Sequence, residues 1–315
     1  AMSVWIAAST AYSMHNQPMI PFYAFYSMFG FQRIGDLAWA AGDSQARGFL
    51  IGATAGRTTL NGEGLQHADG HSHVLASTIP NCVSYDPTYG YELAVIVHDG
   101  LRRMYKNKEN VFYYITTMNE NYVHPAMPAG AEEGIIRGLY MLKEAPSSTA
   151  KIVQLIGSGA ILLEVEAAAE LLQEVFGIRA NVWSATGMNE LRKEAMEAQR
   201  WNMLHPLDEP QVPWVTQQLR GTRGPVVAAS DYMKIHSEQI RAFLPGRTYY
   251  TLGTDGFGRS DSREKLRHHF EVDRYFIVIA ALNALADDGE IGRSVVEDAI
   301  RRFDINPEKP YAPKV

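Results

Sequence analysis

Short runs of consecutive apolar residues alternate along this chain with longer stretches in which apolar positions recur every three or four residues. The short runs predict strands buried on both faces, and the longer stretches predict helices that bury one stripe. Strands are expected at Phe49–Ala53, Cys82–Tyr85, Val111–Thr116, Lys151–Ile156, Asn181–Trp183, Pro225–Ala228 and Thr248–Leu252. Helices are expected at Tyr89–Lys106, Met188–Gln199, Asp231–Phe243, Asp273–Asp287 and Arg293–Phe303, with another that carries Ile161, Val165, Ala168, Leu172 and Val175 on one face. This alternation predicts an α/β fold with mostly parallel sheets.

Turn-forming residues interrupt this alternation near the middle of the chain. His124-Pro125, Pro128-Ala129-Gly130 and Pro146-Ser147-Ser148 read as turns, with a short helix between them. A chain of 315 residues also exceeds one typical domain. We therefore expect two doubly wound domains, one over residues 1–130 and one over residues 140–315.

The first thirty residues contain no Lys, Arg, Asp or Glu. A signal peptide would need a basic leader, and His15-Asn16-Gln17-Pro18 interrupts the apolar stretch. The helix expected at Val4–Tyr12 is apolar on most sides, which is typical of a buried helix. The chain is thus expected to begin inside a domain, and this region is expected to form most of a dimer interface.

Composition narrows the classes of function. A net charge of −6 without a run of lysine and arginine argues against a nucleic-acid surface. The apolar run Tyr275–Leu282 is far shorter than the roughly 20 residues that a membrane helix needs, so no membrane span is expected. The single cysteine, Cys82, excludes an internal disulfide and fits a reducing, cytoplasmic setting, and its apolar neighbours indicate a core residue rather than a nucleophile.

The densest cluster of reactive side chains is the segment Asn61–His73. It holds three histidines, two carboxylates and three glycines, which combine proton-transfer groups with backbone freedom. Taken alone, it is as well explained by solvated or hydrogen-bonded side chains as by an active-site loop. Zinc or iron ligation by His67, His71 and His73 is a weaker alternative, since their spacing matches no common metal motif. Gly157-Ser158-Gly159 resembles a phosphate cradle, but Leu162 stands where a third glycine would be needed, which favours a tight turn.

Longer segments carry a family resemblance that favours the active-site interpretation. The matching segments are Pro21–Leu37, Ala46–Gly52, Asn61–His73, Met118–Tyr122, Trp201–Pro206 and Gly253–Asp273. Together they resemble the homodimeric pyruvate dehydrogenases, the thiamine-diphosphate-dependent decarboxylating components of the pyruvate dehydrogenase complex. The resemblance covers essentially the whole chain. It implies a transketolase-like carboxyl-terminal portion, namely part of the pyrimidine-binding domain and the domain that follows it.

The resemblance also assigns roles to individual residues. His67 matches the family histidine that faces substrate, and Tyr26 and Phe29 match aromatic positions beside the aminopyrimidine ring of the cofactor. Arg33 and Glu63 match polar positions around the cofactor, which structural ion pairing explains almost as well. His71 is expected to be a supporting residue of the site or its loop. The family's metal-binding Gly-Asp-Gly motif does not occur here, so no residue of this chain is expected to bind metal, and magnesium is expected on a preceding domain. The glutamate that activates the cofactor would fall just before Ala1.

The implied reaction is oxidative decarboxylation of pyruvate with reductive acetylation of a lipoyl group. The implied partners are pyruvate, the lipoyl domain of dihydrolipoyl acetyltransferase and a second copy of the chain, in the cytoplasm. This piece alone is expected to be inactive, and a non-catalytic dimerisation or scaffold module remains the alternative.

The segment Gly253–Arg263 is expected to be an interdomain loop, with Phe257 near the site but not catalytic.

Overall fold

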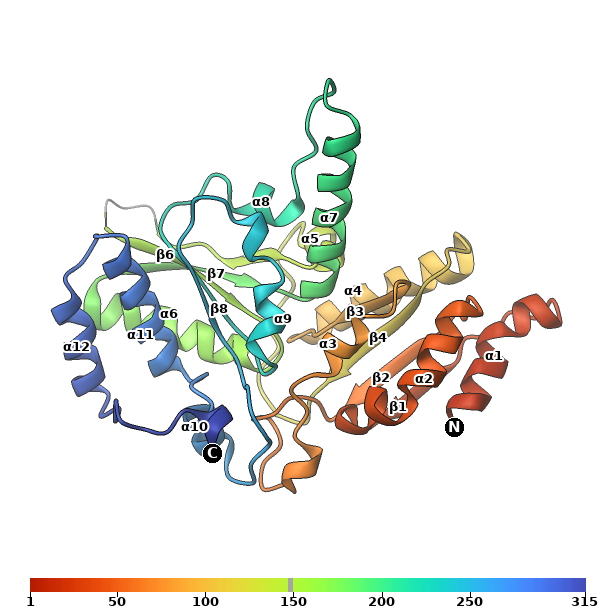
Figure 1. The fold of residues 1–315 in the computed structure, drawn as a ribbon, viewed down its shortest axis with the longest axis horizontal. Coiled ribbons are helices and arrows are strands. Elements are labelled where there is room, and N and C mark those ends of the chain that lie inside the picture. Colours follow the sequence, from red (N-terminus) through yellow and green to blue (C-terminus); the bar gives the residue numbers. More distant parts are fainter. Residues whose placement is uncertain (147–149) are drawn as a thin grey trace.

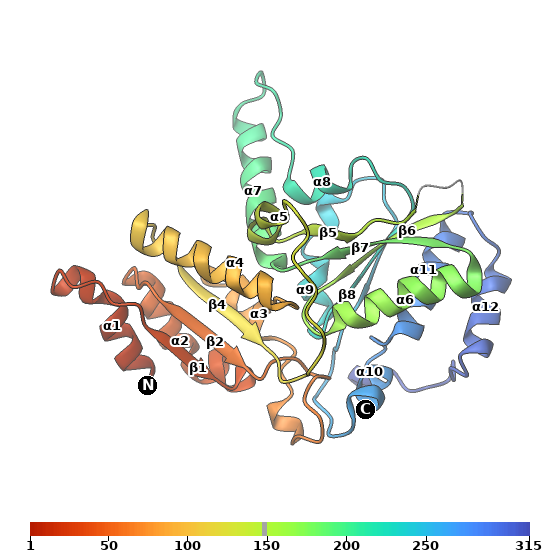
Figure 2. The same cartoon turned by 180° about the vertical axis from the view of Figure 1, so that it is seen from behind.

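The computed structural model describes residues 1–146 and 150–315 and contains two β-sheets that lie side by side (Figures 1 and 2). The first sheet has the strand order β1-β2-β4-β3, and all of its neighbouring strands are parallel. Its strands are β1 (Phe22–Phe25), β2 (Phe49–Ala53), β3 (Cys82–Tyr85) and β4 (Phe112–Thr117).

Helices cover both faces of this first sheet. One face packs against α1 (Met2–Met14), α2 (Gly30–Asp43) and α3 (Ser72–Ala76), and the other against α4 (Gly90–Leu101) and α5 (Glu132–Arg137). Successive side chains of one strand alternate between the two cores: Leu50 lies in the first and Phe49 in the second, and both are fully buried. This two-sided burial is why the strands read as continuous apolar runs.

The second sheet is mixed, with the order β5-β7-β6-β8-β9. Its strands are β5 (Tyr140–Lys143), β6 (Ile152–Gly157), β7 (Arg179–Ser184), β8 (Val226–Ala229) and β9 (Tyr249–Leu252), and only β5 pairs antiparallel. One face carries α6 (Ile161–Phe176), α11 (Arg274–Asp287) and α12 (Arg293–Arg302). The other carries α7 (Met188–Leu204), α8 (Trp214–Leu219) and the residues around α9 (Lys234–Glu238). The helix α10 (Arg263–His269) lies toward the junction with the first sheet (Figure 1).

The seven expected strands are present, each with bounds within two residues of those predicted. The expected fold class of two α/β domains is likewise present. The turn at Gly157-Ser158-Gly159 precedes a helix whose Leu162 is fully buried in the core, as a tight packing turn requires. Of the three turn segments, Pro146-Ser147-Ser148 falls partly outside the described residues. Within those residues, no helix is both long and apolar enough to cross a bilayer.

Two predictions of local structure are wrong. The helix expected at Asp231–Phe243 is reduced to α9 and a 3-10 turn at Arg241–Phe243, because Asp231 and Tyr232 are instead fixed by contacts to the first sheet. The helix α1 is not interior: Val4 is 72% exposed, and only Met2, Trp5, Ser9 and Ala11 are buried. No other described element covers the outer side of α1, which lies at one end of the molecule (Figure 1).

Candidate functional site

The carboxyl ends of the parallel strands of both sheets meet at the junction between the two halves of the molecule. Residues just after β3, β6 and β8 make contacts between the two halves there: Asp86 accepts a hydrogen bond from the Ser158 hydroxyl, and Asp231 from the Thr58 hydroxyl. A long loop, residues 54–71, leaves β2 at this junction and returns through α3. Ligands of open α/β sheets bind at the carboxyl ends of strands, so this edge is the expected place for a site.

An aromatic cluster forms at the outer rim of this junction. The rings of Tyr26 and His67 are stacked, with centroids 5.1 Å apart and an interplanar angle of 5°, and the Phe29 ring meets His67 edge-on, also at 5.1 Å. The Arg33 guanidinium lies over the Phe29 ring, 4.1 Å from its centroid. Tyr26 is 54% exposed, so the cluster presents aromatic surface to solvent.

His67 is also paired with a carboxylate. Its Nδ1 atom lies 3.2 Å from Glu63 Oε2, and both side chains are partly exposed. When Nδ1 carries the proton and donates it to Glu63, Nε2 is left as a proton acceptor. The pair thus orients the imidazole and sets its tautomer, as a carboxylate does in other acid–base sites. The structure therefore brings together Tyr26, Phe29, Arg33, Glu63 and His67, five of the six residues expected at the site.

The other two histidines of the loop face elsewhere. The His71 Nε2 atom contacts the Gln32 side chain at the start of α2, and burial lowers the pKa of His71. His73 is buried, with Nε2 2.9 Å from Thr116 Oγ1 and its ring against Tyr232. Among residues 1–146 and 150–315, no group of three His, Cys, Asp or Glu side chains is placed to hold a metal ion.

Sequence analysis missed a buried polar network behind the loop. The Thr116 hydroxyl donates to Asp86 Oδ1 (2.6 Å), and the Ser158 hydroxyl donates to Asp86 Oδ2 (2.9 Å). Since Thr116 has one proton to give, His73 Nε2 is the donor to Thr116. Burial raises the pKa of Asp86 to about 7, and burial also lowers the pKa of His73. One signal was present in the sequence: Asp86 directly follows one predicted buried strand, and Ser158 lies two residues after another.

The expected interdomain loop does join the two halves. Arg263 Nε donates to the Thr59 carbonyl (2.6 Å), and the Gly62 amide donates to the Asp261 carbonyl (3.0 Å). Gly258 packs so tightly that a Cβ atom there would lie 2.4 Å from the Leu65 carbonyl oxygen. Phe257, by contrast, is 80% exposed. The loop therefore supports the segment that carries His67 through its backbone rather than through Phe257.

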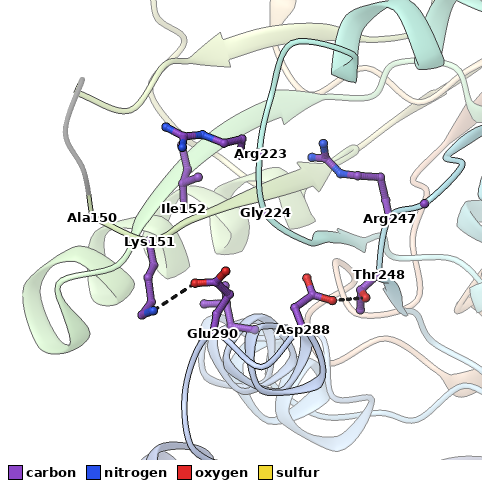
Figure 3. A pocket seen from close by; sticks show the side chains of 11 residues that line it. Ala150, Lys151, Ile152, Arg223, Gly224, Arg247, Thr248, Asp288 and Glu290 are labelled. Carbon is purple, nitrogen blue, oxygen red and sulfur yellow. Dashed lines mark hydrogen bonds and ion pairs between the residues drawn. The ribbon is translucent and has the colours of Figure 1, made fainter.

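A cavity of about 330 Å³ lies at the opposite edge of the second sheet, at the amino ends of β6, β8 and β9 (Figure 3). Two of its polar contacts are drawn: Lys151 Nζ lies 3.1 Å from Glu290 Oε2, and the Thr248 hydroxyl donates to Asp288. None of the lining residues belongs to the loop that carries His67. This hollow is thus separate from the aromatic cluster.

Comparison with known families matches both halves of the chain. Residues 1–125 match the family described as the pyruvate dehydrogenase E1 component middle domain, and residues 138–273 match the transketolase-like TK C-terminal domain. Among solved structures, transketolase from Campylobacter jejuni superposes with a TM-score of 0.66 at 18% identity, over 88% of this chain and 38% of that one. A chain of split-gene transketolase superposes with a TM-score of 0.62 at 16% identity, over 90% of this chain and 80% of that one. These two likenesses show the fold.

The curated relatives are much more similar in sequence. The pyruvate dehydrogenase E1 component of Pseudomonas aeruginosa is 65% identical over 309 residues, which are 98% of this chain and 35% of that protein. The corresponding protein of Escherichia coli K12 is 61% identical over 306 residues, which are 97% of this chain and 34% of that protein. The chain thus spans about a third of the length of these relatives. The chain belongs to the pyruvate dehydrogenase E1 family and corresponds to the middle domain and the transketolase-like C-terminal domain of the E1 component.

Proposed function

We propose that this chain supplies the substrate-facing half of a pyruvate dehydrogenase active site, within a longer E1 polypeptide. The observation that carries the proposal is the His67–Glu63 pair stacked on Tyr26 and bordered by Phe29. An imidazole with an oriented free nitrogen, set in exposed aromatic surface, suits a small substrate that must be held and must exchange a proton. The reaction is the oxidative decarboxylation of pyruvate, with transfer of the acetyl group to a lipoyl domain of dihydrolipoyl acetyltransferase.

The side chains present fit one end of thiamine diphosphate. Tyr26 and Phe29 offer ring surfaces for the aminopyrimidine, although Arg33 covers one face of Phe29 and His67 covers one face of Tyr26. Such a stack contributes about 0.5–1.5 kcal/mol, enough to orient a ring but not to bind the cofactor. Because the sequence lacks the family's Gly-Asp-Gly motif, we assign magnesium and the diphosphate to the part of E1 outside this chain. When bound, thiamine diphosphate supplies the electron sink that decarboxylation of a 2-oxo acid requires.

His67 then acts on the substrate itself. In the protonated imidazole, Nδ1–H donates to Glu63, which fixes the ring orientation, and Nε2–H donates a hydrogen bond to the pyruvate carboxylate or carbonyl oxygen. In the neutral imidazole, Nε2 is the acceptor that takes up a proton. Arg33 keeps Phe29 in place, and His71 anchors the end of the loop to α2 through Gln32. In this proposal, residues 1–130 form the domain that faces the ring of the cofactor, and residues 140–315 form the supporting domain.

A second candidate is a dimerisation or scaffold module without catalytic function. The large exposed apolar side chains near the amino terminus favour it: Val4, Met14, Met19, Ile20, Phe22, Leu37 and Trp39. Exposed apolar side chains of this kind suit contact with a second copy of the chain. The split-gene transketolase chain, which shares this fold, is described as an inactive β4 tetramer. Light scattering of this chain should report a dimer or larger assembly under both candidates.

Complementation separates the two candidates. The chain is mixed or coexpressed with a polypeptide that carries the rest of E1, and carbon dioxide release from pyruvate is measured with an artificial electron acceptor. We expect no turnover from either piece alone, turnover from the mixture, and little turnover from a mixture that carries His67→Ala. Calorimetry on the chain alone should detect no tight binding of thiamine diphosphate with magnesium. Turnover that does not depend on His67 would support the scaffold candidate instead.

A further inference from the structure

One carboxylate of the second domain accepts several hydrogen bonds from the loop that carries His67. Asp231 lies two residues after the end of β8 and is almost fully buried. Its two oxygens accept hydrogen bonds from the Thr58 amide (2.9 and 3.1 Å), while the Thr58 hydroxyl donates to Oδ1 (2.8 Å) and the Thr59 hydroxyl to Oδ2 (2.7 Å). Every one of these contacts crosses from the first domain to the second.

The backbone of the loop is shaped to admit this carboxylate. Gly56 has a φ of +93°, and a Cβ atom at this position would lie 2.2 Å from Asp231 Oδ2. The Arg57 amide donates to the Asp231 carbonyl (3.4 Å), so the loop is bound to both the side chain and the backbone of Asp231. Close approach of this kind requires glycine.

Arg57 extends the connection to the immediate neighbour of His67. Its Nη1 donates to the carbonyls of Thr254 (2.7 Å) and Gly256, and its Nε donates to the Ala68 carbonyl (3.4 Å). Beyond His67, the Met233 amide donates to the Gly70 carbonyl (2.7 Å). The second domain therefore holds the loop on both sides of His67.

The surroundings of Asp231 suit an ionised carboxylate. The side-chain contacts from Thr58 and Thr59 are all donors, and bonds to a charged acceptor are stronger than neutral ones. Burial raises the pKa of Asp231, while the donors on Thr59 and Thr58 and the charge of Arg267 act against that shift. An amide in place of the carboxylate would turn one acceptor into a donor that faces a donor.

We propose that Asp231 is a positioning residue for His67: it holds the loop so that the imidazole stays on Tyr26 with Nε2 toward the substrate. The catalytic consequence rests on the proposed function, whereas the holding of the loop does not. The proposal gives the transketolase-like domain a direct part in the geometry of a site whose side chains all come from the middle domain.

The first test uses this chain alone and measures hydrogen exchange of backbone amides. In Asp231→Asn, amides of residues 56–71 should exchange at least tenfold faster than in the natural chain, while those of β6 and β8 keep their rates. Asp288→Asn is the matched control, because Asp288 also accepts from a threonine hydroxyl but lies at the opposite edge of the sheet. Unchanged exchange in the loop, or equal effects of the two variants, overturns the proposal.

Thr59→Val gives a second route if Asp231→Asn does not fold. It keeps the shape of the side chain and removes only the donor to Asp231 Oδ2. We expect the same amides to exchange faster, but by a smaller factor. Protection equal to that of the natural chain would contradict the proposal that Asp231 holds the loop.

The second test uses the full-length E1 enzyme and a double-mutant cycle. Asp231→Asn should lower kcat at least tenfold with little change in KM, but by less than twofold when His67 is already alanine. A general structural role would lower kcat by the same factor in both backgrounds, and that result refutes positioning through His67. If His67→Ala itself leaves kcat unchanged, the proposed function fails, and the exchange experiment alone decides whether Asp231 holds the loop.

Discussion

The two edges of the second sheet differ in how they use charge. At the carboxyl edge, Asp231 and Asp86 are buried, accept several hydrogen bonds each and join the two domains. At the amino edge, the pairs around the cavity of Figure 3 are largely exposed and join residues of the same domain. Buried, fully hydrogen-bonded groups fix geometry, whereas exposed ion pairs contribute little. The hollow at the amino edge is therefore not the place where function is expected.

Replacement of His67 by alanine should have the largest effect of all the substitutions. In the full-length enzyme, turnover of pyruvate should fall by roughly 10²–10⁴, the usual contribution of one positioned acid–base or oxyanion-binding group. Thiamine diphosphate binding should stay nearly intact, since the proposed role of His67 is to contact the substrate and not the cofactor. Lys151→Ala, at the cavity edge, is the control and should leave the rate unchanged. Retained turnover in His67→Ala would contradict the assignment of catalytic function to the carboxyl edge.

Glycine substitutions compare the packing of the two edges directly. Gly246, at the cavity, has a φ of +69° and open space around it, so Gly246→Ala should lower the free energy of unfolding by about 1–2 kcal/mol through backbone strain alone. Gly56→Ala adds an overlap with Asp231 and should cost about 3 kcal/mol or more in total. Urea unfolding of both variants measures the difference. Equal costs would mean that the interdomain edge is less tightly packed than the distances indicate.

The buried Asp86 makes stability depend on pH with a definite sign. Burial raises its pKa from 3.8 to about 7, so between these values the folded state binds more protons than the unfolded state. Its contribution to stability is then greatest at acid pH and falls as the pH rises toward 7. A difference of one in pKa between the folded and unfolded states corresponds to about 1.4 kcal/mol. When the pH is raised from 5 to 7.5, the free energy of unfolding of Asp86→Asn should rise relative to that of the natural chain. Urea unfolding of both proteins at both pH values measures this change.

Subtracting the free energy of unfolding of the variant from that of the natural chain at each pH cancels the contributions of other titrating groups. His73 and His236 have lowered pKa values, so their effect has the opposite sign, and it is present in both proteins. A difference between the two proteins that does not change with pH would show that Asp86 titrates normally.

The smallest effect is expected at the exposed pair of the cavity. Lys151 and Glu290 are 41% and 56% exposed, and such pairs contribute between zero and about 1 kcal/mol. Glu290→Gln should therefore change the free energy of unfolding by less than about 0.5 kcal/mol. A loss comparable to that of Gly56→Ala would contradict the contrast between the two edges.

Local patterns were sufficient for the strands and insufficient for the junction. Continuous apolar runs such as Cys82–Tyr85 predict buried parallel strands because both faces are covered. The short antiparallel strand β5 gave no such signal. Residues 231–243 have a helical composition, but the first of them, Asp231, is held by a contact to the other domain. Thr58 and Asp231 are 173 positions apart, so their contact follows from the three-dimensional fold and not from any local spacing.

The site residues show the same division. Tyr26, Phe29 and His67 were predicted from a family resemblance, and the loop was singled out by its histidines and glycines. The structure places their rings close together, and the role of each stays a proposal. Asp86 and Thr116 have ordinary sequence neighbours, and only their burial against Ser158 and His73 makes them notable.

The buried cysteine makes the chain convenient for spectroscopy. Cys82 is the only cysteine, is fully buried in β3, and has a pKa raised to about 12 by burial. Because thiolate is the reactive form, maleimide and methanethiosulfonate reagents should leave it unmodified near neutral pH. A cysteine placed at an exposed position of the loop, such as Gln66→Cys, would then carry a spin label or fluorophore with no background from Cys82. Motion of the loop could be followed in this way without first removing a native thiol.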